Sequence, residues 1–69
     1  MPDWAMKNSR VEGDGVLWDL YHNDALVLTD GYSACYVHVL TNGRNDETYQ
    51  EEYGDGKTGA IYTVSELKG

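Results

Sequence analysis

The side chains that could do chemistry in this chain are few: one cysteine, two histidines and twelve carboxylates in 69 residues. Cys35 and His38 stand three residues apart, a spacing common among metal ligands, and His22 is the remaining soft ligand. If these residues lie on a strand, that spacing sends Cys35 and His38 to opposite faces. A structural zinc site needs four ligands. We therefore expect no metal and interpret Cys35 as a small buried hydrophobic residue.

Catalysis by a nucleophile or by an acid–base pair has equally little support. A cysteine nucleophile needs a histidine within hydrogen-bond reach and a third, orienting group, and opposite faces separate Cys35 from His38. The adjacent carboxylates of Glu51 and Glu52 diverge on a strand or a helix, so they form no acid–base couple. The Gly-Lys-Thr at 56–58 matches the end of a phosphate-binding loop, but that loop requires glycine where Glu51 stands. We therefore expect neither enzyme activity nor a cofactor.

The densest functional signal is the stretch 46–55, which carries five acids, two tyrosines and no basic residue. Tyrosine combines apolar area with a polar group and is enriched where surfaces meet partners. The simpler alternative is that these tyrosines only pack the half-exposed face of a sheet. In the functional interpretation, spaced carboxylates imitate nucleic-acid phosphates and compete for a site built from lysine and arginine. The predicted partner-binding residues are Asp46, Glu47, Tyr49, Glu51, Glu52, Tyr53 and Asp55.

The overall charge limits the partners of the chain. Twelve acids against five basic residues give a net charge of -7. A broad nucleic-acid-binding surface needs clustered lysine and arginine, so we expect neither direct nucleic-acid binding nor attachment to anionic membranes. A chain this acidic is attracted to basic protein surfaces, although the same charge is also what solubility alone would favour.

Cysteine usage and the N-terminal sequence bear on location. A secreted chain of this size is usually rich in disulfides, whereas Cys35 is the single cysteine. The first residues lack the basic start and the apolar stretch of a signal peptide. The uncharged run 32–43 is far too short and too mixed in polarity to span a membrane. We therefore expect a cytoplasmic protein.

Short apolar runs separated by turn-forming residues predict the elements that position these side chains. The runs are 16–21, 25–29 and 34–40, and the turn-forming stretches are Gly13-Asp14-Gly15, Asn23-Asp24, Asp30-Gly31 and Asn42-Gly43. Runs rich in Val, Leu, Tyr and Trp between such turns are typical of an antiparallel meander. In the third run, alternation places Cys35, Val37 and Val39 in one apolar row that faces the core.

The segment 45–53 fits two structures. An asparagine at its start could cap a short helix that a following glycine ends, or the segment could form a strand paired with 36–40. As a strand, it places Tyr49, Glu51 and Tyr53 on one side. The Asn-Gly turn expected just before it requires a partner strand soon afterwards, so we favour the strand.

The predicted domain organisation is an N-terminal arm at 1–10, in which Trp4 docks on the sheet, and a single small antiparallel domain at 11–69. A strand at 60–64 ends this domain. The predicted fold class is mainly β, or small α+β, with about four to six short strands in one sheet. One short helix joins them if 45–53 is helical.

These features predict a non-enzymatic binding protein or inhibitor whose acidic, tyrosine-bearing surface occupies a basic, nucleic-acid-binding site on a partner protein. By class alone, small acidic cytosolic proteins of this kind include phage-encoded inhibitors such as anti-CRISPR proteins and nucleic-acid mimics. The alternative is a structural domain that forms a homodimer through an exposed sheet edge or face, because a chain this small gains stability by pairing its edges.

Overall fold

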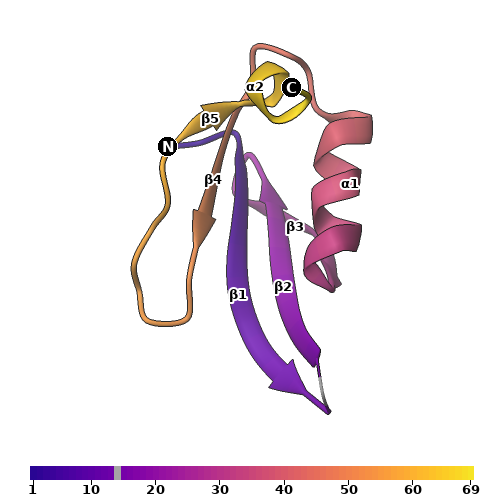
Figure 1. Ribbon diagram of the computed structural model, residues 1–69, viewed down its shortest axis with the longest axis vertical. Coiled ribbons are helices and arrows are strands. Elements are labelled where there is room, and N and C mark those ends of the chain that lie inside the picture. Colours follow the sequence, from indigo (N-terminus) through magenta and orange to yellow (C-terminus); the bar gives the residue numbers. More distant parts are fainter. Residues whose placement is uncertain (14) are drawn as a thin grey trace.

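The computed structural model describes residues 1–13 and 15–69 and shows one five-stranded sheet with two short helices (Figure 1). The elements are β1 (Trp4–Glu12), β2 (Gly15–His22), β3 (Ala25–Asp30), α1 (Tyr32–Asn42), β4 (Thr48–Glu52), β5 (Tyr62–Thr63) and α2 (Val64–Leu67). The strands lie in the order β3-β2-β1-β4-β5, and α1 packs against β2 and β3. The predicted class, a small α+β fold made mostly of strands, is confirmed. The antiparallel meander is only partly right.

The strand β1 lies at the centre of the sheet, so residues 1–10 are not the peripheral arm that the sequence suggested. It pairs antiparallel with β2 and parallel with β4, and the parallel pair breaks the expected meander. Its residues alternate between the two faces of the sheet, with Trp4 and Met6 buried on one face and Lys7 exposed on the other. The burial expected of Trp4 is confirmed, but Trp4 reaches the core as a residue of β1 and not by docking from an arm. Asp14, in the turn predicted after this strand, lies outside the described residues.

The hairpin between β2 and β3 forms as the sequence predicts. Asn23 and Asp24 make its two-residue turn with φ values of 50° and 68°, and positive φ at both central residues is the mark of a type I′ turn. A register shift between Leu20 and Tyr21 marks a bulge in the pairing with β3. The strand β3 lies at the edge of the sheet, where Leu26 is 56% exposed.

The segment 34–40 was predicted as a strand, and this prediction is wrong because the segment lies inside α1. Cys35 and Val39, one helical turn apart, are fully buried, whereas Val37 between them is 57% exposed. A strand and a helix would both place residues 35 and 39 on the same side. The two structures differ at residue 37, which a strand places with them and a helix turns away.

The Asn-Gly pair at 42–43 ends α1, so the prediction of a hairpin turn at this pair is also wrong. Gly43 has a φ of -75°, whereas a type I′ turn needs a positive φ. Its N–H donates to the carbonyl oxygen of Val39 at 2.7 Å. A Cβ on Gly43 would lie 2.7 Å from that oxygen and 3.1 Å from Nε1 of Trp4. Glycine therefore allows the end of α1 to approach the indole ring closely.

The segment 45–53 contains the strand β4, which confirms the favoured alternative for this segment. Its neighbours are β1 and β5, because the segment expected to pair with it is helical. The final strand predicted at 60–64 shrinks to the two residues of β5. It is short because Thr63 and Glu66 form a capping box that starts α2 immediately.

The core lies between one face of the sheet and the two helices. Its buried apolar residues are Trp4, Met6, Leu20, Cys35, Val39, Tyr49 and Val64. Both helices contribute to this cluster, so within the described part of the chain the opposite face of the sheet has no covering helix. No helix in residues 1–13 and 15–69 is long and apolar enough to cross a membrane.

Candidate functional site

The strand β4 divides the acidic stretch between the two faces of the sheet. In its parallel register with β1, Glu51 stands opposite the buried Met6, and Glu52 stands opposite the exposed Lys7. Since neighbouring residues of a strand point to opposite faces, Glu51 faces the side covered by α1 and Glu52 faces the open side. Two acids that are adjacent in the sequence therefore belong to different surfaces.

The carboxylate of Glu51 accepts hydrogen bonds from three tyrosine hydroxyls. Tyr49 donates to Oε2 of Glu51 at 2.5 Å, and Tyr32, the first residue of α1, donates to the same oxygen. Tyr53 donates to Oε1 at 3.1 Å. The donors come from the helix, from β4 and from the residue that follows β4. The fold therefore brings a helix terminus and a strand terminus together on one carboxylate.

The aromatic rings around Glu51 pack at steep angles to one another. The ring of Trp18 meets the rings of Tyr32 and Tyr53 edge-on, with centroids 5.4 Å and 6.3 Å apart. Tyr36 meets Tyr49 at 85° with centroids 6.0 Å apart, whereas Tyr32 and Tyr36 are stacked. Edge-to-face pairs of this kind stabilise a protein by about 0.5–1.5 kcal/mol beyond their buried area. The packing therefore holds the rings in place.

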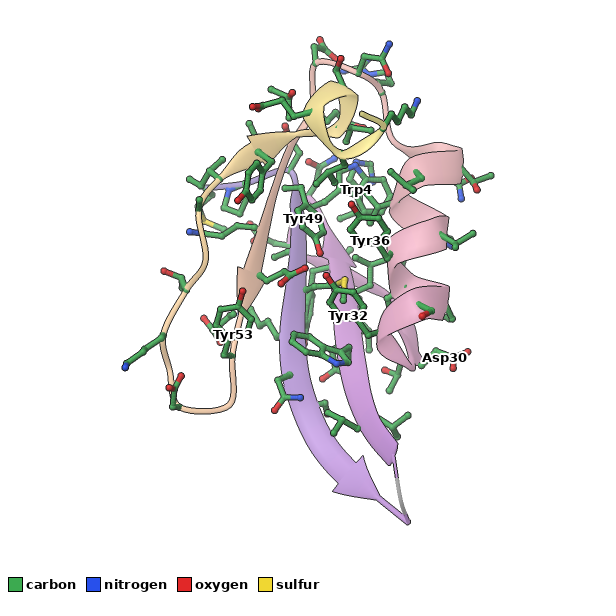
Figure 2. All side chains as sticks on the ribbon, viewed as in Figure 1. Trp4, Asp30, Tyr32, Tyr36, Tyr49 and Tyr53 are labelled. Carbon is green, nitrogen blue, oxygen red and sulfur yellow. The ribbon has the colours of Figure 1, made fainter. Side chains whose placement is uncertain are left out.

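The tyrosines of these pairs and Glu51 line a surface hollow of about 310 Å³, which we call the tyrosine hollow. Its side-chain walls include five of the six tyrosines and one carboxylate, namely Tyr32, Tyr36, Tyr49, Tyr53, Tyr62 and Glu51. Figure 2 shows Tyr32, Tyr36 and Tyr49 between α1 and β4, with Tyr53 beyond the end of β4. Tyr32, Tyr53 and Tyr62 are 41%, 42% and 45% exposed, so their rings are open to solvent.

The environment of the hollow raises the pKa of three of its phenols. Burial, followed by the hydrogen bond to Glu51, raises the pKa of Tyr32 to about 12. The same two causes raise the pKa of the more deeply buried Tyr49 well above its ordinary value. The hydrogen bond to Glu51 is the main cause that raises the pKa of Tyr53. The hydroxyls therefore act as neutral donors, and a raised pKa does not suit tyrosine as a general base at neutral pH.

Glu47, the second residue of the predicted patch, is buried in a separate cluster. Its Oε1 accepts from Nε1 of Trp4 at 3.0 Å and from the backbone N–H of Arg44 at 2.7 Å. Its Oε2 lies 2.8 Å from Nε2 of His22, whose ring stacks on Trp4 with centroids 3.9 Å apart. The bond from Arg44 N–H, followed by the bond with His22, lowers the pKa of Glu47 to about 2. The buried carboxylate of Glu47 therefore links Trp4, His22 and the backbone of Arg44 within the protein and is not available to a partner.

The remaining predicted site residues lie apart from the tyrosine hollow. Asp46 is in the turn before β4, with its side chain 82% exposed. Asp55 is exposed in the loop after β4, where it accepts from the backbone N–H of Lys57 at 3.0 Å. Glu52 lines a second hollow of about 280 Å³ on the open side of the sheet. Of the seven predicted residues, the structure brings together only Tyr49, Glu51 and Tyr53.

Three tyrosines of the hollow are absent from the residues predicted to bind a partner. Tyr32 and Tyr36 stand four residues apart, a spacing that places both on one side of a helix. The signal was missed because the segment 34–40, which contains Tyr36 and begins shortly after Tyr32, was predicted as a strand. Tyr62 arrives from the other end of the chain, and no local spacing links it to β4.

The soft ligands are engaged within the protein. The thiol of Cys35 is buried, as expected, and its Sγ lies 3.6 Å from the carbonyl oxygen of Trp18. His38 meets Trp4 edge-on with ring centroids 5.9 Å apart. Among the residues that the structure describes, no three side chains of His, Cys, Asp or Glu form a group able to hold a metal.

Comparisons of the chain with protein-family models, with curated proteins and with solved structures gave no match. A carboxylate surrounded by neutral donors and accessible aromatic rings is suited to binding a positively charged group.

Proposed function

We propose that this chain is a non-enzymatic binding protein that docks its tyrosine hollow onto a basic site of a partner protein and so inhibits that partner. The observation that carries this proposal is the carboxylate of Glu51, held by three phenol hydroxyls at a surface hollow. Tyrosine is enriched among the residues that dominate binding energy at interfaces. A net charge of -7 guides the approach to a basic surface.

The distribution of acids favours docking centred on the hollow over imitation of a long row of phosphates. Glu47 is buried, and Glu51 and Glu52 face opposite sides of the sheet. The strand β4 therefore presents one carboxylate to each side, whereas a phosphate row requires several on one surface. A basic site that binds nucleic acid stays a suitable target, as for small phage-encoded inhibitors such as anti-CRISPR proteins, because one well-placed carboxylate engages one of its cationic side chains.

The test compares two variants that remove the same charge from adjacent residues. Glu51→Gln neutralises the carboxylate of the hollow and keeps an oxygen that accepts from tyrosine. Glu52→Gln makes the same change on the opposite face and is the matched control. The partner is captured from a lysate of the source cell or its natural host, identified, purified and titrated with each variant at low and moderate salt.

We expect Glu51→Gln to weaken binding of the purified partner by about tenfold or more, because it removes a charge-assisted contact. Glu52→Gln is expected to weaken it much less, because an exposed charge outside the interface contributes little. Moderate salt should weaken binding of the wild-type chain. Equal losses in the two variants, with both folded by circular dichroism, would contradict docking through the hollow.

Self-association through the sheet is a second candidate function, favoured by the exposed edge strand. Leu26 and Val27 of β3 are 56% and 44% exposed at this edge, and unpaired edge strands invite pairing with another chain. A dimer joined at β3 makes the melting temperature rise with protein concentration. A constant melting temperature across a wide concentration range would exclude this function.

A further inference from the structure

We infer that the tyrosine hollow receives the ammonium group of a lysine side chain, plain or methylated, on the partner. This inference rests on the proposed docking function and specifies which chemical group docks there. It follows from the faces of the aromatic rings and from the hydrogen bonds that Glu51 already makes.

The ring arrangement is suited to a cation. An ammonium group is attracted to the face of an aromatic ring when it lies within about 6 Å of the ring centre. Tyr36 and Tyr49 meet edge-on at 85° and both line the hollow, with Tyr49 only 2% exposed. Tyr53 and Tyr62, each more than two-fifths exposed, line its accessible part. A cation that enters therefore meets the exposed aromatic surface of Tyr53 and Tyr62 beside Glu51.

The hydrogen bonds of Glu51 distinguish lysine from arginine. An ionised carboxylate has about four lone-pair positions, two on each oxygen. Tyr32 and Tyr49 occupy both positions on Oε2, and Tyr53 occupies one on Oε1. Among the described contacts, one position on Oε1 is therefore left. A bidentate guanidinium needs one position on each oxygen, whereas an ammonium needs only one, and a methylated ammonium relies mainly on ring faces.

Small analogues test this assignment without the partner. The probes are Nα-acetyl-lysine methylamide, its Nε-trimethyl form, its neutral Nε-acetyl form and the corresponding arginine compound. Binding to the whole chain is followed by the NMR shifts of the tyrosine rings and of the Trp18 indole. We expect the lysine and trimethyl-lysine probes to bind and to shift these signals. The neutral probe is expected not to bind, and the arginine probe to bind no more tightly than lysine.

Matched variants separate the hollow from the general attraction of an acidic protein for cations. Glu51→Gln is expected to weaken binding of the lysine probe by about tenfold, and Glu52→Gln to leave it nearly unchanged. Tyr53→Phe keeps the ring and loses only the hydroxyl that donates to Glu51, so it should weaken binding less than Tyr53→Leu does. Tyr53→Leu loses the ring and should bind about threefold more weakly. Tyr53 is 42% exposed, so neither variant disturbs the core.

Three outcomes would overturn the inference: equal binding of the neutral probe, equal weakening by Glu51→Gln and Glu52→Gln, or tighter binding of the arginine probe. Its failure is distinguishable from failure of the proposed function. If the lysine probes do not bind while Glu51→Gln still weakens the purified partner, docking stands without an ammonium site. If the probes bind and the partner is indifferent to Glu51→Gln, the ammonium site stands and docking through the hollow fails.

Discussion

Replacing Glu47 by glutamine is expected to remove a large part of the stability of this chain. The carboxylate accepts hydrogen bonds from Trp4 and from the backbone N–H of Arg44, and it pairs with His22. These partners lower its pKa from the ordinary 4.5 to about 2. Since one pKa unit corresponds to about 1.4 kcal/mol, ionised Glu47 stabilises the folded state by about 3 kcal/mol.

The sign of this effect fixes its pH dependence. A carboxyl group with a lowered folded-state pKa gives its full stabilisation above the unfolded-state pKa, here about 4.5. The contribution is lost as the pH falls toward the folded-state pKa of about 2. Glutamine carries no charge at any pH. The difference in unfolding free energy between wild type and Glu47→Gln should therefore be about 3 kcal/mol at neutral pH and shrink toward zero near pH 2.

Urea unfolding, followed by tryptophan fluorescence from neutral to acid pH, measures this difference. A core of this size supplies only about 3–5 kcal/mol, so every sample contains the same stabilising osmolyte to keep the variant folded. Asp46→Asn is the control, because its side chain is 82% exposed and its effect should stay within about 0.5 kcal/mol. A wild-type advantage that stays constant down to pH 2 would refute the assignment of this stability to the charge of Glu47.

Other measurements test the helix, the phenol of Tyr32 and the buried thiol. Val39→Ala is expected to lower the unfolding free energy by about 2 kcal/mol, and Val37→Ala by less than about 0.5 kcal/mol, because only Val39 is buried; equal losses in urea unfolding would contradict α1. In an ultraviolet titration that follows phenolate formation, Tyr32 should ionise near pH 12. Ionisation of every tyrosine near pH 10 in the folded chain would contradict the environment described for the tyrosine hollow. The buried thiol of Cys35, with a pKa that burial raises, should react with a thiol reagent only in urea, and rapid reaction of the native chain would disprove its burial.

Local signals in the sequence predict those parts of the fold that depend on neighbouring residues. Asn23-Asp24 specifies the β2–β3 hairpin because both residues tolerate positive φ. The side-chain alternation expected of a strand correctly places Tyr49, Glu51 and Tyr53 on one side of the chain. Local chemistry is sufficient for a turn and for one strand, because each needs only residues close in sequence.

Other features depend on contacts that the sequence does not contain locally. An apolar pattern at 35, 37 and 39 fits a strand, and the helix differs from it only in the exposure of Val37. The parallel pairing of β1 with β4 joins Trp4 to Tyr49, far along the chain. The helix α1 brings Tyr32 to the carboxylate of Glu51, which is also far away in the sequence. The predicted patch was therefore incomplete because half of the tyrosine hollow is assembled by tertiary contacts.

Glu47 and Glu51 belong to one segment, yet their donors give them different roles. Glu47 accepts from the indole N–H of Trp4 and from a backbone N–H and lies against the ring of His22, so it is enclosed in the core. Glu51 accepts from neutral phenols that line a surface hollow. Hydrogen bonds from neutral donors hold a carboxylate in position without cancelling its charge. Glu51 therefore keeps its attraction for an incoming cation, which is the property that docking on a basic site requires.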